Sequence, residues 1–449
     1  MKRKIPVHEL RKGMYVSELD RPWVGTPFLF QGFEIRTDEE LSQLRALCQH
    51  VFVTEGEDGA TPVAGGAHTP ARSGGSKQAD GRSGPPAGGV GRTRFLATDN
   101  LVQTGTGIIL PPLPGRTGGQ APPRYQDQTS VEEELHEARE IETRTRELIF
   151  SIIDDVRIGR SFHADAARQA VATMTESIVR NPDALVWLTQ LKQRHEYTAT
   201  HSLRVCILAL SFARHLNFTP EQMEMLGTGA LLHDIGKIKV SNDILDKPER
   251  LTDAEYEVMK KHVPWGADLL ATTKGFPQHA IEVARCHHER YSGSGYIMGL
   301  SGDDIGIYGL IAAIVDTYDA LTSDRAYRAG TSAAEALKII YEGRNDMYHP
   351  ALVEQFIQCL GIFPLGSVVE MNTGSIGVVI TVNRARRLKP RVALVLNPDK
   401  KPYGRTTVID LMHKPRDESG RLLEIKNVLA AGQYGIDPTA YIPITLKAG

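Results

Sequence analysis

Helical spacing of apolar residues dominates the middle of the chain. From about 162 to 363, apolar positions recur at the intervals of amphipathic helices. Proline interrupts a helix, so the prolines of this region divide it into helices of ordinary length; they are Pro182, Pro220, Pro248, Pro264, Pro277 and Pro350. The pattern predicts an all-α core.

One long helix is expected just before this core, from about Ser130. Its near-helical positions are Val131, Leu135, Ala138, Ile141 or Glu142, Thr145, Leu148 and Ile152. Such a helix could dimerise and relay a signal, or it could pack on its own domain. Because Glu142 and Thr145 weaken the apolar seam, the second interpretation is favoured.

The two ends of the chain have a different pattern. Near the start, short β-like runs flank a predicted helix that Thr37 caps, with Glu40 at the capping-box position. Near the end, β-branched and polar residues alternate across glycine-containing turns, which is typical of hairpins. Between the first module and the long helix, Gly, Pro, Ser and Thr prevail, which predicts a disordered, flexible insertion or linker.

The predicted fold class is therefore mainly α. A small α+β module is expected at 1–55, a flexible segment at 56–128, a connecting helix at 129–160, the all-α helical domain at 161–365 and a small β appendage at 366–449.

Composition limits the classes of function. With 52 Lys+Arg against 54 Asp+Glu, the chain has no overall field for long nucleic acid, although a small anion remains possible. The four cysteines form no CxxC pair, which favours a reducing cytoplasm over a disulfide framework. The basic start is interrupted before any signal-peptide-like stretch, and the apolar runs fall short of the roughly 20 residues of a membrane span.

The candidate chemistry begins in ALLHDIGKIKV (230 to 240), where His233 precedes Asp234 and Lys237 follows three positions later. On a helix, Asp234 and Lys237 share a face, so a metal held by the aspartate would leave the lysine within reach of a phosphate. Taken alone the pair is weak evidence, because a histidine near a helix end often only caps it.

Five further candidates lie at the edges of apolar helical runs: His201, His262, His287, His288 and Asp316. Burying an unpaired imidazole is costly, so a shared partner explains their positions. Five imidazoles and two carboxylates are too many for one first-row ion but suit two ions bridged by a carboxylate and a hydroxide. The donor set accommodates Fe, Mn, Ni or Zn.

In these segments the sequence resembles the HD-GYP branch of the HD-domain metal-dependent phosphohydrolases. The resemblance spans about 175 to 365, which makes 161–365 the catalytic domain. Its markers, in order, are YTATHS (197 to 202), HDIGKI (233 to 238), LTDAEYEVMKKH (251 to 262), HHERYSGSGY (287 to 296) and VDTYDALTSDRAYR (315 to 328). Residues 1–55 resemble an accessory domain of unknown function often found ahead of it.

The resemblance implies the residue roles. One metal would be held by His201, His233, Asp234 and Asp316, and the other by Asp234, His262, His287 and His288, with Asp234 bridging. Lys237 would assist at the scissile phosphate, Arg325 and Arg328 would bind the ligand's phosphates or guanine, and Tyr296 would line the guanine pocket. The family hydrolyses cyclic di-GMP to pGpG and often on to GMP. For this chain two divalent ions are expected, with Fe or Mn favoured over Ni or Zn.

The sequence departs from the family at several positions. Where some members place a glutamate for a third metal stands Tyr197, which favours a dinuclear centre. In the HHExxDGxGYP motif, Ser292 replaces the aspartate and Ile297 the last proline, and Ala326 replaces the proline of SDRPYR. We expect metal binding to survive with altered contacts to substrate or to a GGDEF-domain partner.

Alternative functions follow from these departures. The chain could be a catalytically weak receptor for cyclic di-GMP or a scaffold for a GGDEF-domain protein. A hydrolase of another nucleotide is less favoured, because such enzymes need not carry the HHE and GY loop. A homodimer is compatible with the long helix.

Overall fold

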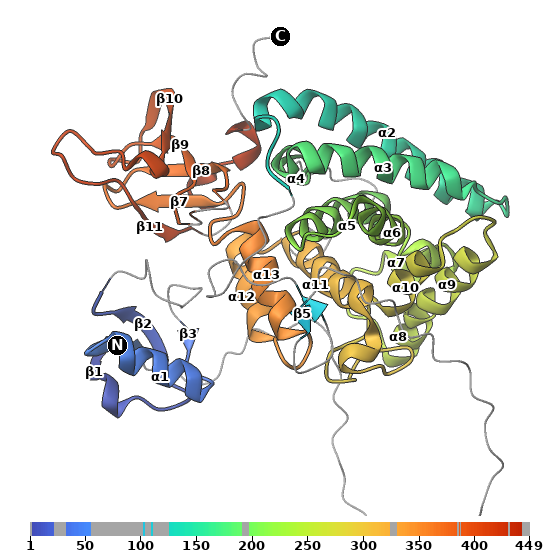
Figure 1. The fold of residues 1–449 in the computed structure, drawn as a ribbon, viewed down its shortest axis with the longest axis horizontal. Coiled ribbons are helices and arrows are strands. Elements are labelled where there is room, and N and C mark those ends of the chain that lie inside the picture. Colours follow the sequence, from blue (N-terminus) through green and yellow to red (C-terminus); the bar gives the residue numbers. More distant parts are fainter. Residues whose placement is uncertain are drawn as a thin grey trace, which may run out of the picture. The chain divides into compact units, whose positions relative to one another are not determined.

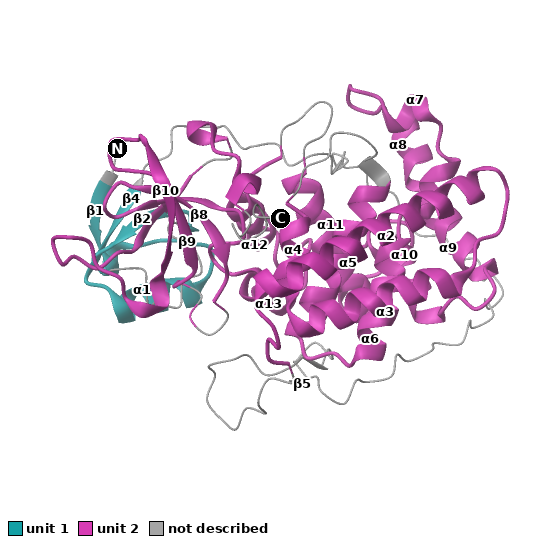
Figure 2. Cartoon of the chain, turned by 90° about the horizontal axis from the view of Figure 1, so that it is seen from above, with its two compact units in different colours: residues 1–96 teal, residues 97–449 magenta. Residues whose placement is uncertain are grey.

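The computed structural model describes most of the chain in two compact units, residues 1–96 and 97–449 (Figures 1 and 2). The described residues are 2–21, 33–54, 102–103, 109–110, 125–190, 197–323, 330–383, 386, 388–429 and 432–441. Each unit has its own hydrophobic core and is described by itself.

In its described residues, the first unit is a four-stranded antiparallel sheet with one α-helix and a short 3-10 helix, Val7–Glu9. The strand order is β1-β4-β2-β3, with β1 Lys2–Pro6, β2 Tyr15–Leu19, β3 Phe33–Glu34 and β4 His50–Thr54. Helix α1 (Asp38–Leu47) begins at the predicted capping box, in which Thr37 and Glu40 satisfy each other's backbone N–H groups. The buried residues Val16, Ile35 and Leu44 belong to its core.

The second unit is built mainly of helices, as predicted (Figure 1). Its α-helices are α2 Val131–Arg157, α3 Ala164–Arg180, α4 Pro182–Leu188, α5 Tyr197–His215, α6 Pro220–Leu231, α7 Asn242–Leu245, α8 Asp253–Lys260, α9 His262–Thr272, α10 Gln278–Cys286, α11 Ile307–Thr322, α12 Ala333–Glu342 and α13 Pro350–Leu360. Proline occupies the first position of α4, α6 and α13, where its missing N–H costs no helical hydrogen bond.

The long helix α2 packs against α3, α4 and α5 of the same unit, as the favoured interpretation expected. Its buried stripe includes Ile149, whereas the predicted Leu148 is only half-buried. Glu134 is also buried, because the Arg180 guanidinium donates to both of its oxygens at 2.8 Å and Ser177 donates at 2.7 Å. A buried carboxylate needs such partners.

A five-stranded antiparallel sheet follows the helices, in the order β10-β9-β8-β7-β11. Its strands are β7 Val368–Met371, β8 Ile376–Thr381, β9 Arg391–Leu396, β10 Pro402–Asp410 and β11 Ile425–Val428. The buried Trp187 of α4 donates its indole N–H to the carbonyl of Ile380 at 2.8 Å, which joins helices and sheet. This is the predicted β appendage.

Most of the predicted flexible segment, 56–128, lies outside the described residues. Within it, the short strands β5 (Val102–Gln103) and β6 (Ile109–Leu110) pair antiparallel. None of the described helices is long and apolar enough to cross a membrane.

Candidate metal centre

The His233-Asp234 pair lies just beyond a helix, not within one. Helix α6 ends at Leu231, and a 3-10 helix runs over Ile235–Lys239, so the expectation of one helix through this segment was wrong. Side chains three apart eclipse each other in a 3-10 turn. The Lys237 ammonium accordingly lies 2.5 Å from Oδ2 of Asp234, so the two residues still meet.

Glycines bring the neighbouring elements close enough to form the site. A Cβ on Gly236 would lie 1.9 Å from the carbonyl oxygen of His262, at the start of α9. A Cβ on Gly309 of α11 would lie 2.6 Å from the Cβ of Cys286, which precedes His287. Only glycine permits both approaches, so the contacts depend on residues that carry no side chain themselves.

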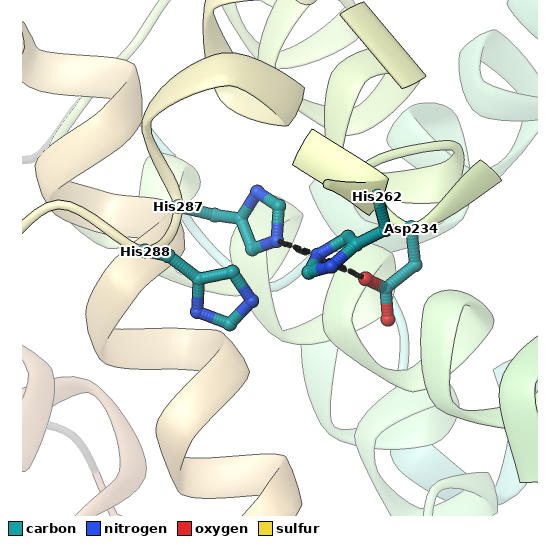
Figure 3. Close-up of side chains that lie close together, drawn as sticks. All are labelled: Asp234, His262, His287 and His288. Atoms are coloured by element: carbon teal, nitrogen blue, oxygen red, sulfur yellow. Dashed lines mark hydrogen bonds and ion pairs between the residues drawn. The ribbon is translucent and has the colours of Figure 1, made fainter. Parts of the chain in front are cut away.

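Two clusters of metal-binding side chains result, each with ligand atoms within 4.8 Å of one another. One consists of His201, His233 and Asp316; the other consists of Asp234, His262, His287 and His288 (Figure 3). They come from five separate segments: α5, the turn after α6, the start of α9, the end of α10 and α11. The structure thus brings together all seven residues that the sequence singled out.

Asp234 connects the two clusters through its two oxygens. Its Oδ2 lies 3.3 Å from Nε2 of His233 and 3.7 Å from Nε2 of His201. Its Oδ1 lies 3.3 Å from Nε2 of His262 and 3.8 Å from Nε2 of His287. One carboxylate therefore faces both groups, which is the arrangement that a bridging ligand requires.

Backbone carbonyls orient three of the imidazoles. The Nδ1 atoms of His233, His262 and His287 lie 2.7 to 2.9 Å from the carbonyl three residues earlier. A carbonyl only accepts, so Nδ1 carries the hydrogen and Nε2 keeps its lone pair. The Nε2 atoms of His262 and His287 then face each other at 3.4 Å, and in this tautomer neither can donate to the other. A cation between them would satisfy both.

His201 is held by a carboxylate that the sequence reasoning missed. Its Nδ1 lies 2.7 Å from Oδ2 of Asp319, while its Nε2 lies 3.0 Å from Oδ1 of Asp316. Arg204 donates to Asp319 at 2.7 Å. The available signal was an aspartate one turn after Asp316 in an otherwise apolar helix, where a buried charge demands a partner.

Burial and charge set the protonation states. Burial lowers the pKa of His262 to about 4 and that of His287 to about 3. Burial opposes ionisation of Asp234, but the nearby Lys237 and His233 hold its pKa well below the ordinary value. Burial likewise opposes ionisation of Asp316, and the His201 contact outweighs it. At neutral pH His262 and His287 are therefore neutral and Asp234 and Asp316 are charged, which metal binding requires.

The donor set fits divalent metal ions. His233 Nε2 and Asp234 Oδ1 are buried and lack a hydrogen-bond partner. Leaving such atoms unpaired costs free energy, whereas ligation would satisfy them. Imidazole with carboxylate is a donor combination for Fe, Mn, Ni or Zn, and seven such groups exceed the coordination of one ion.

Comparison with known proteins identifies the family of the chain. Residues 182–352 match the family model of the HD domain, residues 2–167 a domain of unknown function (DUF3391), and residues 368–416 a KOW domain associated with the HD domain. "Cyclic di-GMP phosphodiesterase PA4108" of Pseudomonas aeruginosa is 31% identical over 413 residues, which cover 92% of this chain and 89% of that protein. The chain belongs to the family of HD-domain phosphodiesterases. The resemblance to the HD-GYP branch is confirmed.

Other relatives match mainly one part of the chain. A "cyclic di-GMP phosphodiesterase" of Vibrio cholerae is 37% identical over 201 residues, 41% of each chain. A "3'3'-cGAMP-specific phosphodiesterase 3" of the same organism is 36% identical over 168 residues, 37% of this chain and 36% of that protein. This chain therefore spans well under half the length of these two relatives.

Tyr296, expected in the substrate pocket, lies beside the second cluster. Its ring stacks on His288 with centroids 4.7 Å apart, and Tyr256 meets it edge-on at 6.1 Å. The family departures lie in the same loop, where Ser292 donates to the Ser294 hydroxyl at 3.0 Å and Ile297 is 46% exposed.

The other expected substrate-binding residues, Arg325 and Arg328, lie outside the described residues, as do Ala326 and the side chain of Tyr197. Their roles stay predictions.

Proposed function

We propose that the seven clustered side chains hold two divalent metal ions and that the chain hydrolyses a cyclic dinucleotide, cyclic di-GMP. The observation that carries the proposal is Asp234, whose two oxygens face two different groups of metal-binding side chains. A pair of ions held this way would activate water and neutralise charge on a phosphoryl group.

The residues of the chain divide the remaining work. His201, His233 and Asp316 would complete the first metal site, and His262, His287 and His288 the second. The Lys237 ammonium, 22% exposed beside the buried Asp234, is positioned to donate to a phosphate oxygen as negative charge builds up. Because the carboxylates and most of the imidazoles are buried, bulk water screens these charges little.

The substrate follows from the relatives. Two of the relatives above are named as cyclic di-GMP phosphodiesterases and one as specific for 3'3'-cGAMP. We infer cyclic di-GMP because the relative with that name covers most of this chain. The linear product pGpG would result, and a second cleavage would give GMP. Tyr296, Arg325 and Arg328 would contact the dinucleotide. Fe or Mn are the favoured ions, with Ni and Zn as alternatives.

A second candidate is a receptor or a GGDEF-domain scaffold with little turnover. It is favoured by the loop that carries the family departures, in which Ile297 and Met298 are each 46% exposed. Exposed apolar neighbours of this kind suit a protein contact. A cytoplasmic location, expected from the cysteines, is compatible with both candidates, and all four cysteines are free and buried.

The deciding experiment uses one preparation purified without oxygen and loaded with Fe or Mn. Metal content is measured together with the products of cyclic di-GMP, 3'3'-cGAMP and a mononucleotide panel, separated by chromatography. We expect about two ions per chain and linear product from cyclic di-GMP. Binding of cyclic di-GMP by the metal-loaded protein without any linear product would reject hydrolysis in favour of the receptor.

Asp234→Ala should abolish both metal binding and turnover, because it removes the side chain that both clusters share. Asp243→Ala is the matched control, since Asp243 is exposed on the short helix α7 nearby in the sequence. A variant that loses Asp234 and still binds two ions would contradict the bridging role.

A further inference from the structure

A buried glutamate lies directly after the two histidines of the second cluster. Glu289 is fully buried, and both of its oxygens accept backbone N–H groups from the far side of the following loop. Met298 donates to Oε1 at 2.8 Å and Leu300 donates to Oε2 at 3.1 Å. The side chain thus closes the loop 290–300 back onto the end of α10.

Much of the loop faces water. Ser292, Ser294, Ile297, Met298 and Gly299 are all exposed. Side chains in water contribute little burial energy, so polar contacts decide where such a loop lies. At its beginning, Tyr291 and Ser292 donate their N–H groups to the carbonyls of Met347 and Asp346. At its end, the backbone N–H groups of Met298 and Leu300 both donate to Glu289.

The returning half of the loop carries Tyr296 over the second cluster. The Tyr296 N–H donates to the carbonyl of His288 at 3.3 Å, and the ring stacks on the His288 imidazole. Gly295 allows this approach, because a Cβ there would lie 2.5 Å from the Cα of Glu289. Tyr296 also lies near Lys260, whose ammonium is 5.8 Å from the ring centroid.

We propose that Glu289 is a positioning residue that holds Tyr296 in place through the loop 290–300. It touches neither the proposed ions nor the substrate, and it acts by fixing the wall that Tyr296 forms beside His288. The expected effect of Glu289 on substrate binding rests on the proposed function. The hydrogen bonds between Glu289 and the loop do not depend on that function.

Glu289→Gln tests the proposal with almost no change in volume. Glutamine has a single acceptor oxygen, so one of the two N–H groups must lose its partner. We expect amide hydrogen exchange at Met298 or Leu300 to become about tenfold faster or more. With cyclic di-GMP as substrate, we expect KM to rise about tenfold while kcat changes less than about threefold, because a displaced Tyr296 weakens substrate binding. Metal content should stay as in the wild type.

Glu418→Gln is the matched control, since it makes the same change at an exposed glutamate between β10 and β11, away from the loop 290–300. It should leave exchange, KM and metal content unchanged. Glu289→Asp, one methylene too short to reach both amides, provides a second variant if glutamine impairs folding.

Two results would overturn the proposal. Unchanged exchange at Met298 and Leu300 in Glu289→Gln would show that Glu289 does not hold the loop. Loss of metal in parallel with activity would assign Glu289 to the metal centre instead. If the wild type turned over no cyclic dinucleotide, the proposed function would fail, whereas the exchange of the two amides would still decide whether Glu289 holds the loop.

Discussion

His201 and Asp319 form a buried pair in which Nδ1 of the imidazole lies 2.7 Å from a carboxylate oxygen. The opposite ring nitrogen, Nε2, faces Asp316 and Asp234. Because Asp319 can only accept when ionised, it holds the hydrogen of His201 on Nδ1 and leaves Nε2 free to bind a metal ion. Arg204 and Ser323 in turn donate to Asp319, so its own orientation is fixed.

Asp319→Asn should therefore weaken metal binding without removing a proposed ligand. Partners of this kind typically change metal affinity about 10- to 100-fold. Titration of the metal-free protein with Mn(II) against a competing chelator measures the affinity. Asp304→Asn is the control, because Asp304 is exposed just before α11. Equal affinities in Asp319→Asn and wild type would show that Asp319 does not orient His201.

Gly236→Ala should push the 3-10 helix Ile235–Lys239, which follows Asp234, away from α9. The added Cβ would lie 1.9 Å from the carbonyl oxygen of His262, so the backbone must shift. Overpacking of this kind costs about 1–3 kcal/mol or more of unfolding free energy, and the shift moves His262 away from Asp234. Urea unfolding and metal stoichiometry together measure the effect.

Gly404→Ala is the matched control for that substitution, because no atom lies within 4 Å of its added Cβ. If Gly236→Ala kept both full stability and full metal content, the close approach would not be needed to form the site.

Removing metal should lower thermal stability. His233 Nε2 and Asp234 Oδ1 are buried without a hydrogen-bond partner, and ligation would satisfy them only in the folded chain. An ion at about 100 times its Kd adds about 2.7 kcal/mol. For the second unit, residues 97–449, this corresponds to a rise in Tm of about 4 °C. Calorimetry of the metal-free and Mn-loaded protein tests this. The same rise in Asp234→Ala would place the stabilising ion elsewhere.

Acid should destabilise the first unit through Asp20. Burial opposes ionisation of this carboxyl, but the N–H groups of Gln49 and His50 donate to it and lower its pKa to about 2. Since the folded pKa lies below the unfolded value of about 3.9, the stabilisation is complete above the unfolded value and is lost as the pH falls through about 2.

The pH effect is measured by comparing Asp20→Asn with wild type. We expect the variant to be about 2 kcal/mol less stable near neutral pH, with the difference shrinking towards pH 2. Hydrogen exchange of peptides from 2–21 and 33–54 in increasing urea reports on this unit alone. A difference that stays constant between about pH 5 and pH 2 would contradict the low pKa.

Local features of the fold were predictable from the sequence. The capping box of Thr37 and Glu40 and the start of α2 at Ser130 involve residues three apart, so the chain dictates them without distant contacts. The helical core and the C-terminal sheet were likewise predictable from the spacing of apolar residues. Spacing alone did not decide whether Leu148 or Ile149 is buried on α2. Adjacent residues differ by only about 100° around a helix, so the packing of the helix determines which of the two faces the core.

By itself, the sequence determined which residue types are available to the site: scarce histidines and aspartates at the edges of apolar helices, together with the motifs of the family. Only the tertiary structure decided how Asp234 divides its oxygens between the two clusters. It also decided that Asp319 contacts His201 and that Glu289 bonds to the loop that carries Tyr296. His201 and Asp319 are 118 residues apart in the chain. Their contact depends on how α5 packs against α11, and no local sequence pattern indicates how two distant helices pack.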